Sequence, residues 1–123
     1  MKTNIEKIEV NGIAYIREDS ATPRLASLEG MAYVVIRSRD SGCHAGYLAA
    51  RDGTNVVLKD SRRLWFWSGA STLSQLAMEG VKKPKACKFP CKVAELEVFN
   101  ICEIILATEE ARKSIQGVPV WEQ

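Results

Sequence analysis

Alternate residues near the middle of the chain combine positive charge with aromatic rings. Arg63, Trp65 and Trp67 occupy every second position at the end of a run that begins at Val56. Because side chains alternate across a β-strand, this spacing places the three on one strand face. A guanidinium binds phosphate through paired hydrogen bonds, and an indole offers a flat surface on which a base stacks. The pattern therefore predicts a surface for a planar anionic ligand such as a nucleotide.

The same three residues have a second interpretation. Trp and Arg are enriched at protein–protein interfaces, so this face also suits a second packed layer or a contact between subunits. The two interpretations are compatible, because a ligand site can lie between subunits. Only Arg63 shares the surface with the tryptophans, unless a bulge near Asp60 changes the register. The opposite face, expected in the core, carries Val56, Leu58, Asp60, Arg62, Leu64 and Phe66.

Further side chains are candidates for the same ligand. Arg37 and Arg62 are additional guanidinium groups for phosphate, and Phe89 offers a second stacking surface. His44 and the amides of Ser41-Gly42 are candidates for hydrogen bonds to a sugar or phosphate. Alternatively, some of the arginines only pair with nearby aspartates in solvent. The predicted ligand-binding residues are Arg37, His44, Arg62, Arg63, Trp65, Trp67 and Phe89.

The sequence does not indicate a catalytic or metal site. A nucleophile–base pair would need Cys43 or Ser41 oriented on His44, and Cys43 points to the opposite strand face. Cys87 and Cys91 are separated by three residues instead of the two usual in zinc motifs, and we expect reduced thiols in the core. No phosphate-binding loop or zinc-protease motif is present. We expect a binding protein that is not an enzyme, with no catalytic residue, metal or cofactor.

Charge and hydropathy limit the partners. A net charge of +2 is too small to predict binding to duplex nucleic acid, which usually requires a basic stripe. No apolar run approaches the roughly 20 residues of a membrane-spanning helix, and no signal peptide opens the chain. We expect a cytoplasmic protein with no membrane partner.

The beginning of the chain is expected to form an arm. Asn11-Gly12 lies between two apolar runs and predicts a β-hairpin over residues 1–17. Residues 18–30 include Pro23 and are a candidate linker, with a short helical turn near 25–28. A loose linker would allow the hairpin to pack on a neighbouring subunit. The whole chain, 1–123, is expected to form one domain.

The remaining elements follow from apolar periodicity and turn residues. A three-stranded antiparallel meander is predicted at 31–39, 43–51 and 55–67. A helix over 71–80 is expected with Ser71 as its N-cap. A long strand over 93–106, with a bulge near Asn100, precedes a second helix. That helix covers 108–116 with Thr108 as its cap, and the apolar tail 118–121 is expected to dock on the protein. The predicted class is α+β: an antiparallel sheet formed by the hairpin, the meander and one late long strand, with two helices.

Several stretches resemble a family of small phage and prophage proteins labelled as a domain of unknown function. The resemblance lies in Tyr33-Val-Val-Ile-Arg-Ser, Ser41-Gly-Cys-His-Ala-Gly-Tyr-Leu and Arg62-Arg-Leu-Trp-Phe-Trp-Ser-Gly-Ala. It extends to Leu73-Ser-Gln-Leu-Ala and Thr108-Glu-Glu-Ala, so it covers most of the chain. The resemblance implies a phage or mobile-element origin and no particular activity.

The arginines beside aromatics on an antiparallel sheet are also similar to the phage anti-defence sponges that counter Thoeris immunity. Such proteins bind cyclic ADP-ribose isomers, and some bind cyclic oligonucleotides, without degrading them. This similarity implies a protein that sequesters a nucleotide second messenger in the host cytoplasm, in a pocket at the interface of a homo-oligomer (dimer or higher). Two alternatives remain open: an inhibitor that binds a host protein through the Trp/Arg face, and an enzyme that degrades a cyclic nucleotide with His44.

Overall fold

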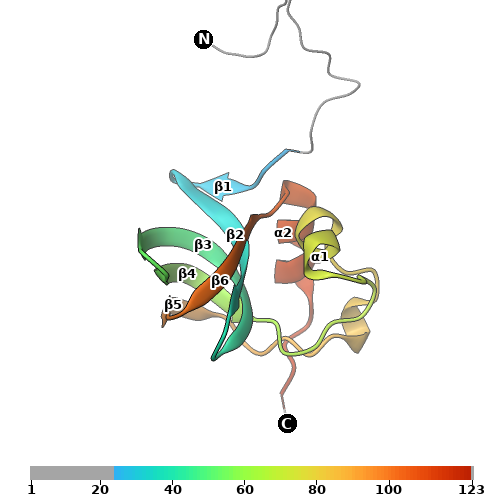
Figure 1. Cartoon of the computed structure of the whole chain (residues 1–123). Coiled ribbons are helices and arrows are strands. Elements are labelled where there is room, and N and C mark those ends of the chain that lie inside the picture. The colour runs from blue at the N-terminus through green and yellow to red at the C-terminus, as the bar shows by residue number, and fades with distance from the viewer. Residues whose placement is uncertain (1–23, 123) are drawn as a thin grey trace, which may run out of the picture.

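The computed structural model describes residues 24–122 and has the predicted α+β class, with an antiparallel sheet and two helices (Figure 1). The predicted N-terminal hairpin lies outside these residues. The strands are β1 (Ser27–Leu28), β2 (Met31–Ser38), β3 (Gly42–Asp52), β4 (Asn55–Arg63), β5 (Val93–Val98) and β6 (Ile101–Leu106). The helices are α1 (Leu73–Glu79), the short 3-10 helix η2 (Pro84–Ala86) and α2 (Glu109–Gly117).

The meander is confirmed, and the late strand is divided. β2, β3, β4 and β5 are neighbours in that order, whereas β6 pairs with the other side of β2. Residues 93–106 therefore form two strands on opposite edges of the sheet. The division lies at Phe99-Asn100, where Asn100 adopts a φ of 58° and the chain turns sharply. Because a two-residue connection joins the two edges, the sheet must curl on itself, as Figure 1 shows.

The curl encloses one apolar cluster, and the two helices cover another. Every strand from β2 to β6 contributes to the first cluster, which is centred on Ile36, Leu58 and Val98. The second cluster lies between the outer face of the sheet and the helices, which lie side by side in Figure 1. Leu76 of α1 and Ile115 of α2 are fully buried in it. The central strand β2 is thus buried on both faces.

A β-bulge in β4 decides which side chains enter which cluster. Ala45 pairs with Arg62 and Tyr47 with Lys59, so two residues of β4 lie opposite one residue of β3. Asp60, in this bulge, has a φ of 53°. The strand therefore contains a bulge near Asp60, which changes the register. Val56 and Leu58 consequently enter the enclosed cluster, whereas Leu64 enters the helix-covered one, although all three were expected on one face.

Gly46 faces this bulge from β3. A Cβ atom at this position would lie 3.1 Å from the carbonyl oxygen of Lys59 and 3.1 Å from the Cα of Ser61. Both neighbours are backbone atoms, which cannot rotate away as a flexible side chain can. The absence of a side chain at Gly46 therefore allows β3 to approach the bulged strand closely.

β4 ends earlier than the sequence predicts. It stops at Arg63 instead of residue 67, so the strict alternation of faces ends there as well. Phe66 was expected in the core but is 49% exposed, because it lies in an irregular segment and pairs with Lys88. A similar difference affects residues 25–28, where the predicted helical turn is replaced by a bridge from Leu25 to Thr108 and by the short strand β1.

Both helices are capped at the N-terminus by threonine side chains. Thr108 caps α2 as predicted, since its Oγ1 accepts a hydrogen bond from the Ala111 amide at 3.0 Å. Helix α1 is capped by Thr72 instead of Ser71. This shift places Gln75 at the third helical position, where its side chain accepts a hydrogen bond at 2.8 Å from the amide of Ser71, the residue before the cap.

The apolar tail docks on the protein as expected. Val118 is buried, and Val120 forms a parallel bridge with Phe89. The amide of Trp121 donates a hydrogen bond to the Phe89 carbonyl at 2.9 Å. Within residues 24–122, no helix is long and apolar enough to cross a membrane.

Candidate functional site

The candidate site is built around Arg63, the last residue of β4. Arg63 pairs with His44 of β3, and its side chain lines two adjacent pockets. Its Nη1 donates a hydrogen bond of 2.7 Å to the carbonyl oxygen of Ser41 in the β2–β3 turn. This contact holds the exposed guanidinium above the turn, while its other nitrogens have no acceptor within residues 24–122.

The larger of the two pockets lined by Arg63, which we term the tryptophan pocket, has a volume of about 500 Å³. Trp65 is 65% exposed, whereas Trp67 is half-buried against the helix-covered cluster. The Asp40 carboxylate at the rim already accepts a hydrogen bond from Asn100. The size of the pocket falls within the range of small-molecule sites. The lining residues are Asp40, Ser41, Gly42, Cys43, Arg63, Leu64, Trp65 and Trp67.

The smaller pocket lined by Arg63, which we term the histidine pocket, has a volume of about 170 Å³. Its buried polar residues are His44 and Ser61, each of which is 1% exposed. Nδ1 of His44 and Oγ of Ser61 have no hydrogen-bond partner among the described residues. Buried polar atoms are rarely left unpaired, so these two atoms, without a partner in the described part of the chain, stand out as hydrogen-bonding groups in the wall of the pocket. The lining residues are His44, Ser61, Arg63, Pro90, Cys91, Val93 and Leu96.

His44 is held in its neutral form. Burial, reinforced by the positive charge of Arg63, lowers the pKa of His44 from 6.5 to about 4. Its Nε2 lies 3.1 Å from the Ser41 hydroxyl, which supplies one hydrogen-bond partner. At neutral pH the imidazole therefore presents one donor and one acceptor and adds no charge to that of Arg63.

The Ser41–His44 contact has the form of a nucleophile–base pair. In such a pair a third group normally orients the base through its other ring nitrogen. Nδ1 of His44 has no such partner within residues 24–122. Cys43, the other candidate nucleophile, packs against the helix-covered cluster, on the opposite face of β3 from His44. The geometry at His44 is therefore suited to hydrogen bonding of a ligand.

The structure brings together four of the seven predicted ligand-binding residues and places the others elsewhere. His44, Arg63, Trp65 and Trp67 line the two pockets. Arg37 lies across from Cys43 on β2, but its guanidinium pairs with Glu103 at 3.0 Å.

Arg62 and Phe89 lie in the protein core. Arg62 is 1% exposed and donates hydrogen bonds to four backbone carbonyls at 2.8–3.5 Å, those of Phe89, Pro90, Ile115 and Gln116. Its guanidinium also lies 5.6 Å from the centre of the Phe89 ring. Both side chains are occupied in joining β4 to the following loop and to α2. They are not accessible from the Arg63 surface.

Five of the seven lining residues of the histidine pocket were not among the candidates, and two of these five, Ser61 and Cys91, carry a hydroxyl or a thiol. Ser61 was placed on the Arg63 face by strand alternation, but nothing in its residue type singled it out. Cys91 comes from a loop that is distant in sequence, so only the tertiary structure could place it beside Arg63.

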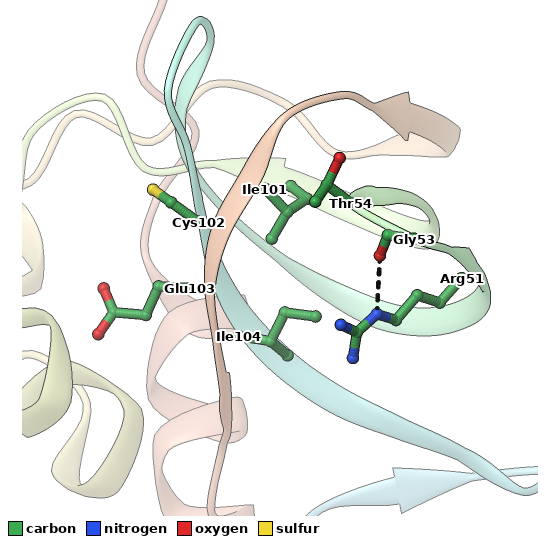
Figure 2. Close-up of a pocket in the computed structure, with 7 residues that line it drawn as sticks. All are labelled: Arg51, Gly53, Thr54, Ile101, Cys102, Glu103 and Ile104. Atoms are coloured by element: carbon green, nitrogen blue, oxygen red, sulfur yellow. Dashed lines mark hydrogen bonds between the residues drawn. The ribbon is translucent and has the colours of Figure 1, made fainter.

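A further pocket of about 250 Å³ lies between β6 and the β3–β4 turn. Figure 2 shows the Arg51 guanidinium facing Ile104, while its Nε donates a hydrogen bond to the Gly53 carbonyl at 3.0 Å. Cys102 and Glu103 lie on the other side of the β6 ribbon. This pocket contains no aromatic side chain and shares no residue with the Arg63 pockets, so it offers no stacking surface.

Comparison with family models gives a match to the family described as a domain of unknown function, DUF6948, over residues 31–115. The chain belongs to the DUF6948 family. The resemblance to an uncharacterised family is thereby confirmed, and the match covers β2 through most of α2, including both Arg63 pockets. No match was found among curated proteins or solved structures. The function of this DUF6948 domain therefore has to be argued from the site.

Proposed function

We propose that the protein binds a small nucleotide at Arg63 and sequesters it without chemical change. The observation that carries the proposal is the position of Arg63 in the shared wall of the tryptophan and histidine pockets. A phosphate at Arg63 would leave the base beside Trp65, which is 65% exposed, and a sugar or second base beside the unpaired atoms of His44 and Ser61. Because Arg63 lines both pockets, the site suits a ligand that has a phosphate between two further groups, such as a cyclic dinucleotide or an ADP-ribose derivative.

A biological role follows from the resemblance to phage proteins. In this proposal the ligand is an immune signal in the host cytoplasm, and its sequestration blocks antiviral defence. The tryptophan pocket opens to solvent beside Trp65, so we also propose that a second copy of the chain closes it. Native mass spectrometry of the purified protein measures both the oligomer mass and any bound small molecule.

Thermal unfolding in the presence of cyclic mononucleotides, cyclic dinucleotides and ADP-ribose isomers tests the proposal. A ligand at about 100 times its Kd should stabilise the protein by roughly 2.7 kcal/mol. Arg63→Ala and Trp65→Ala should remove the shift, whereas Lys59→Ala, which removes a charge outside both pockets, should retain it. Phe89 is unsuitable for this test because it is a core residue. No shift with any of these compounds, or a shift that persists in both pocket variants, would refute the proposal.

Two alternatives are separated by further measurements. The exposed Trp65 and Phe66 favour an inhibitor that binds a host protein, for which a stoichiometric protein partner and no small ligand is expected. The Ser41–His44 contact favours an enzyme. Mass analysis of the ligand after prolonged incubation and denaturation should recover it intact if the protein only sequesters it.

A further inference from the structure

The segment between α1 and β5 is strongly basic. Residues 82–92 contain five lysines and no aspartate or glutamate. All five side chains are exposed. Within residues 24–122, only one of them has a carboxylate partner, the Lys82–Glu79 pair at 3.4 Å. The basic segment therefore concentrates positive charge on a protein whose overall net charge is only +2. The lysines are Lys82, Lys83, Lys85, Lys88 and Lys92.

This basic segment runs antiparallel to residues 61–69, which carry the exposed aromatic side chains. At one end the Lys82 amide donates a hydrogen bond to the Gly69 carbonyl at 3.3 Å. In the middle, Phe66 and Lys88 exchange two backbone hydrogen bonds of 3.3 and 2.7 Å. At the other end, Val93 pairs with Ser61. The segment that carries the lysines and the segment that carries Trp65 and Phe66 therefore lie side by side.

Lys88 is held among the aromatic rings. Its Nζ lies 5.9 Å from the centre of the Phe66 ring and 5.6 Å from that of the Trp121 ring. Cation–π contacts of this length orient the rings about the charge. Phe66 is 49% exposed, and Trp65 beside it is 65% exposed, so ring surface remains available to a partner.

We propose that the basic segment, together with Trp65, Phe66 and Trp121, binds single-stranded nucleic acid. A linear array of cations follows a phosphodiester backbone, and exposed rings beside it stack the unpaired bases. A duplex hides its bases and gives the rings no partner. An anionic membrane would also attract the lysines, but it requires apolar side chains that insert together, whereas here a lysine lies among the rings. The lysines and rings of this site share Trp65 with the tryptophan pocket but include neither Arg63 nor any residue of the histidine pocket, so the site does not depend on the function proposed for Arg63.

Fluorescence anisotropy with labelled 12-nucleotide oligo-dT and oligo-U, at 50 and 200 mM salt, tests this inference. We expect binding at low salt that weakens steeply at high salt, and weaker binding to a 12-base-pair duplex. The double variant Lys85→Ala/Lys88→Ala should weaken binding at least tenfold and reduce the salt slope by about 1.4, the contribution of two phosphate contacts to single strands. Trp121→Ala should weaken binding about 5- to 100-fold through lost stacking.

The matched control is Arg51→Ala/Lys59→Ala, which removes the same charge outside the basic segment. It should change the affinity less than twofold. Absence of binding at 50 mM salt, an equal loss in the control, or a duplex bound as tightly as a single strand would overturn the inference. Binding to phosphatidylglycerol-containing vesicles with none to the oligonucleotides would overturn it in favour of a membrane surface. Because Lys85→Ala/Lys88→Ala leaves both Arg63 pockets intact, it should retain the thermal shift with small nucleotides, so the two proposals fail independently.

Discussion

Arg62 and Arg63 are adjacent in sequence and have opposite environments. The Arg62 guanidinium is buried among backbone carbonyls of the loop after η2 and the C-terminal end of α2, whereas Arg63 faces solvent between two pockets. Burial lowers the pKa of Arg62, but a guanidinium remains protonated at neutral pH. Its charge is stabilised by carbonyl dipoles, including those at the negative end of the α2 dipole.

This contrast predicts that the two arginines differ in their contribution to stability. Arg62→Ala should lower the free energy of unfolding by about 3 kcal/mol, since it removes several buried hydrogen bonds and leaves acceptors unpaired. Arg63→Ala, the control, should change it by less than about 0.5 kcal/mol, as is usual for exposed residues. Urea denaturation followed by circular dichroism measures both values. Equal effects would contradict the structural role of Arg62.

Gly46 should be intolerant of even a methyl group. In Gly46→Ala the new Cβ would contact backbone atoms of the β4 bulge at 3.1 Å, and we expect destabilisation of about 1–3 kcal/mol. Gly117 is a matched control, because a Cβ there meets nothing within 4 Å. Gly117→Ala should be neutral or stabilising by up to about 1 kcal/mol. Thermal melting of the two variants measures this difference. If β3 could move away from the bulge, Gly46→Ala would melt no lower than Gly117→Ala, which would contradict the prediction.

His44 should make the protein less stable in acid. Its pKa is about 4 in the folded state and 6.5 when unfolded, so between these values the unfolded chain binds more protons. The contribution of His44 to stability is fully present above pH 6.5 and is lost as the pH falls toward 4. The loss should reach about 3 kcal/mol. Urea denaturation between pH 4 and 7.5 measures it, and His44→Gln should have a flatter profile; an unchanged profile would exclude His44 as the cause.

The four cysteines should differ in reactivity toward a thiol reagent such as Ellman's reagent. Cys91 and Cys102 are exposed and should react fast. Burial raises the pKa of the Cys43 thiol, which reduces its thiolate fraction, so it should react slowly. Cys87 is buried and should react only on unfolding. Cys→Ser variants assign each phase, and a nucleotide in the histidine pocket should slow the Cys91 phase but not that of Cys102.

Local signals in the sequence determined most of the elements. The β-branched run at 31–38, the turns at 39–41 and 53–54, and the threonine cap of α2 each depend on neighbours within a few residues. Strand alternation also placed Arg63 on the opposite face from Arg62, although Trp65 and Trp67 lie beyond the end of β4. These features could be predicted because short-range sterics and hydrogen bonding decide them.

Only the tertiary structure decided which strands pair at the edges of the curled sheet and which polar groups become buried. Asn100 sends β6 to the far edge of the sheet, and the extra residue at Asp60 divides the buried residues of β4 between two cores. The docking of residues 82–92 along the aromatic segment brings Cys91 to Arg63 and buries Arg62 beneath Phe89. These outcomes depend on contacts between residues about 20 to 70 positions apart. The free energies of such contacts cannot be predicted from a local sequence pattern.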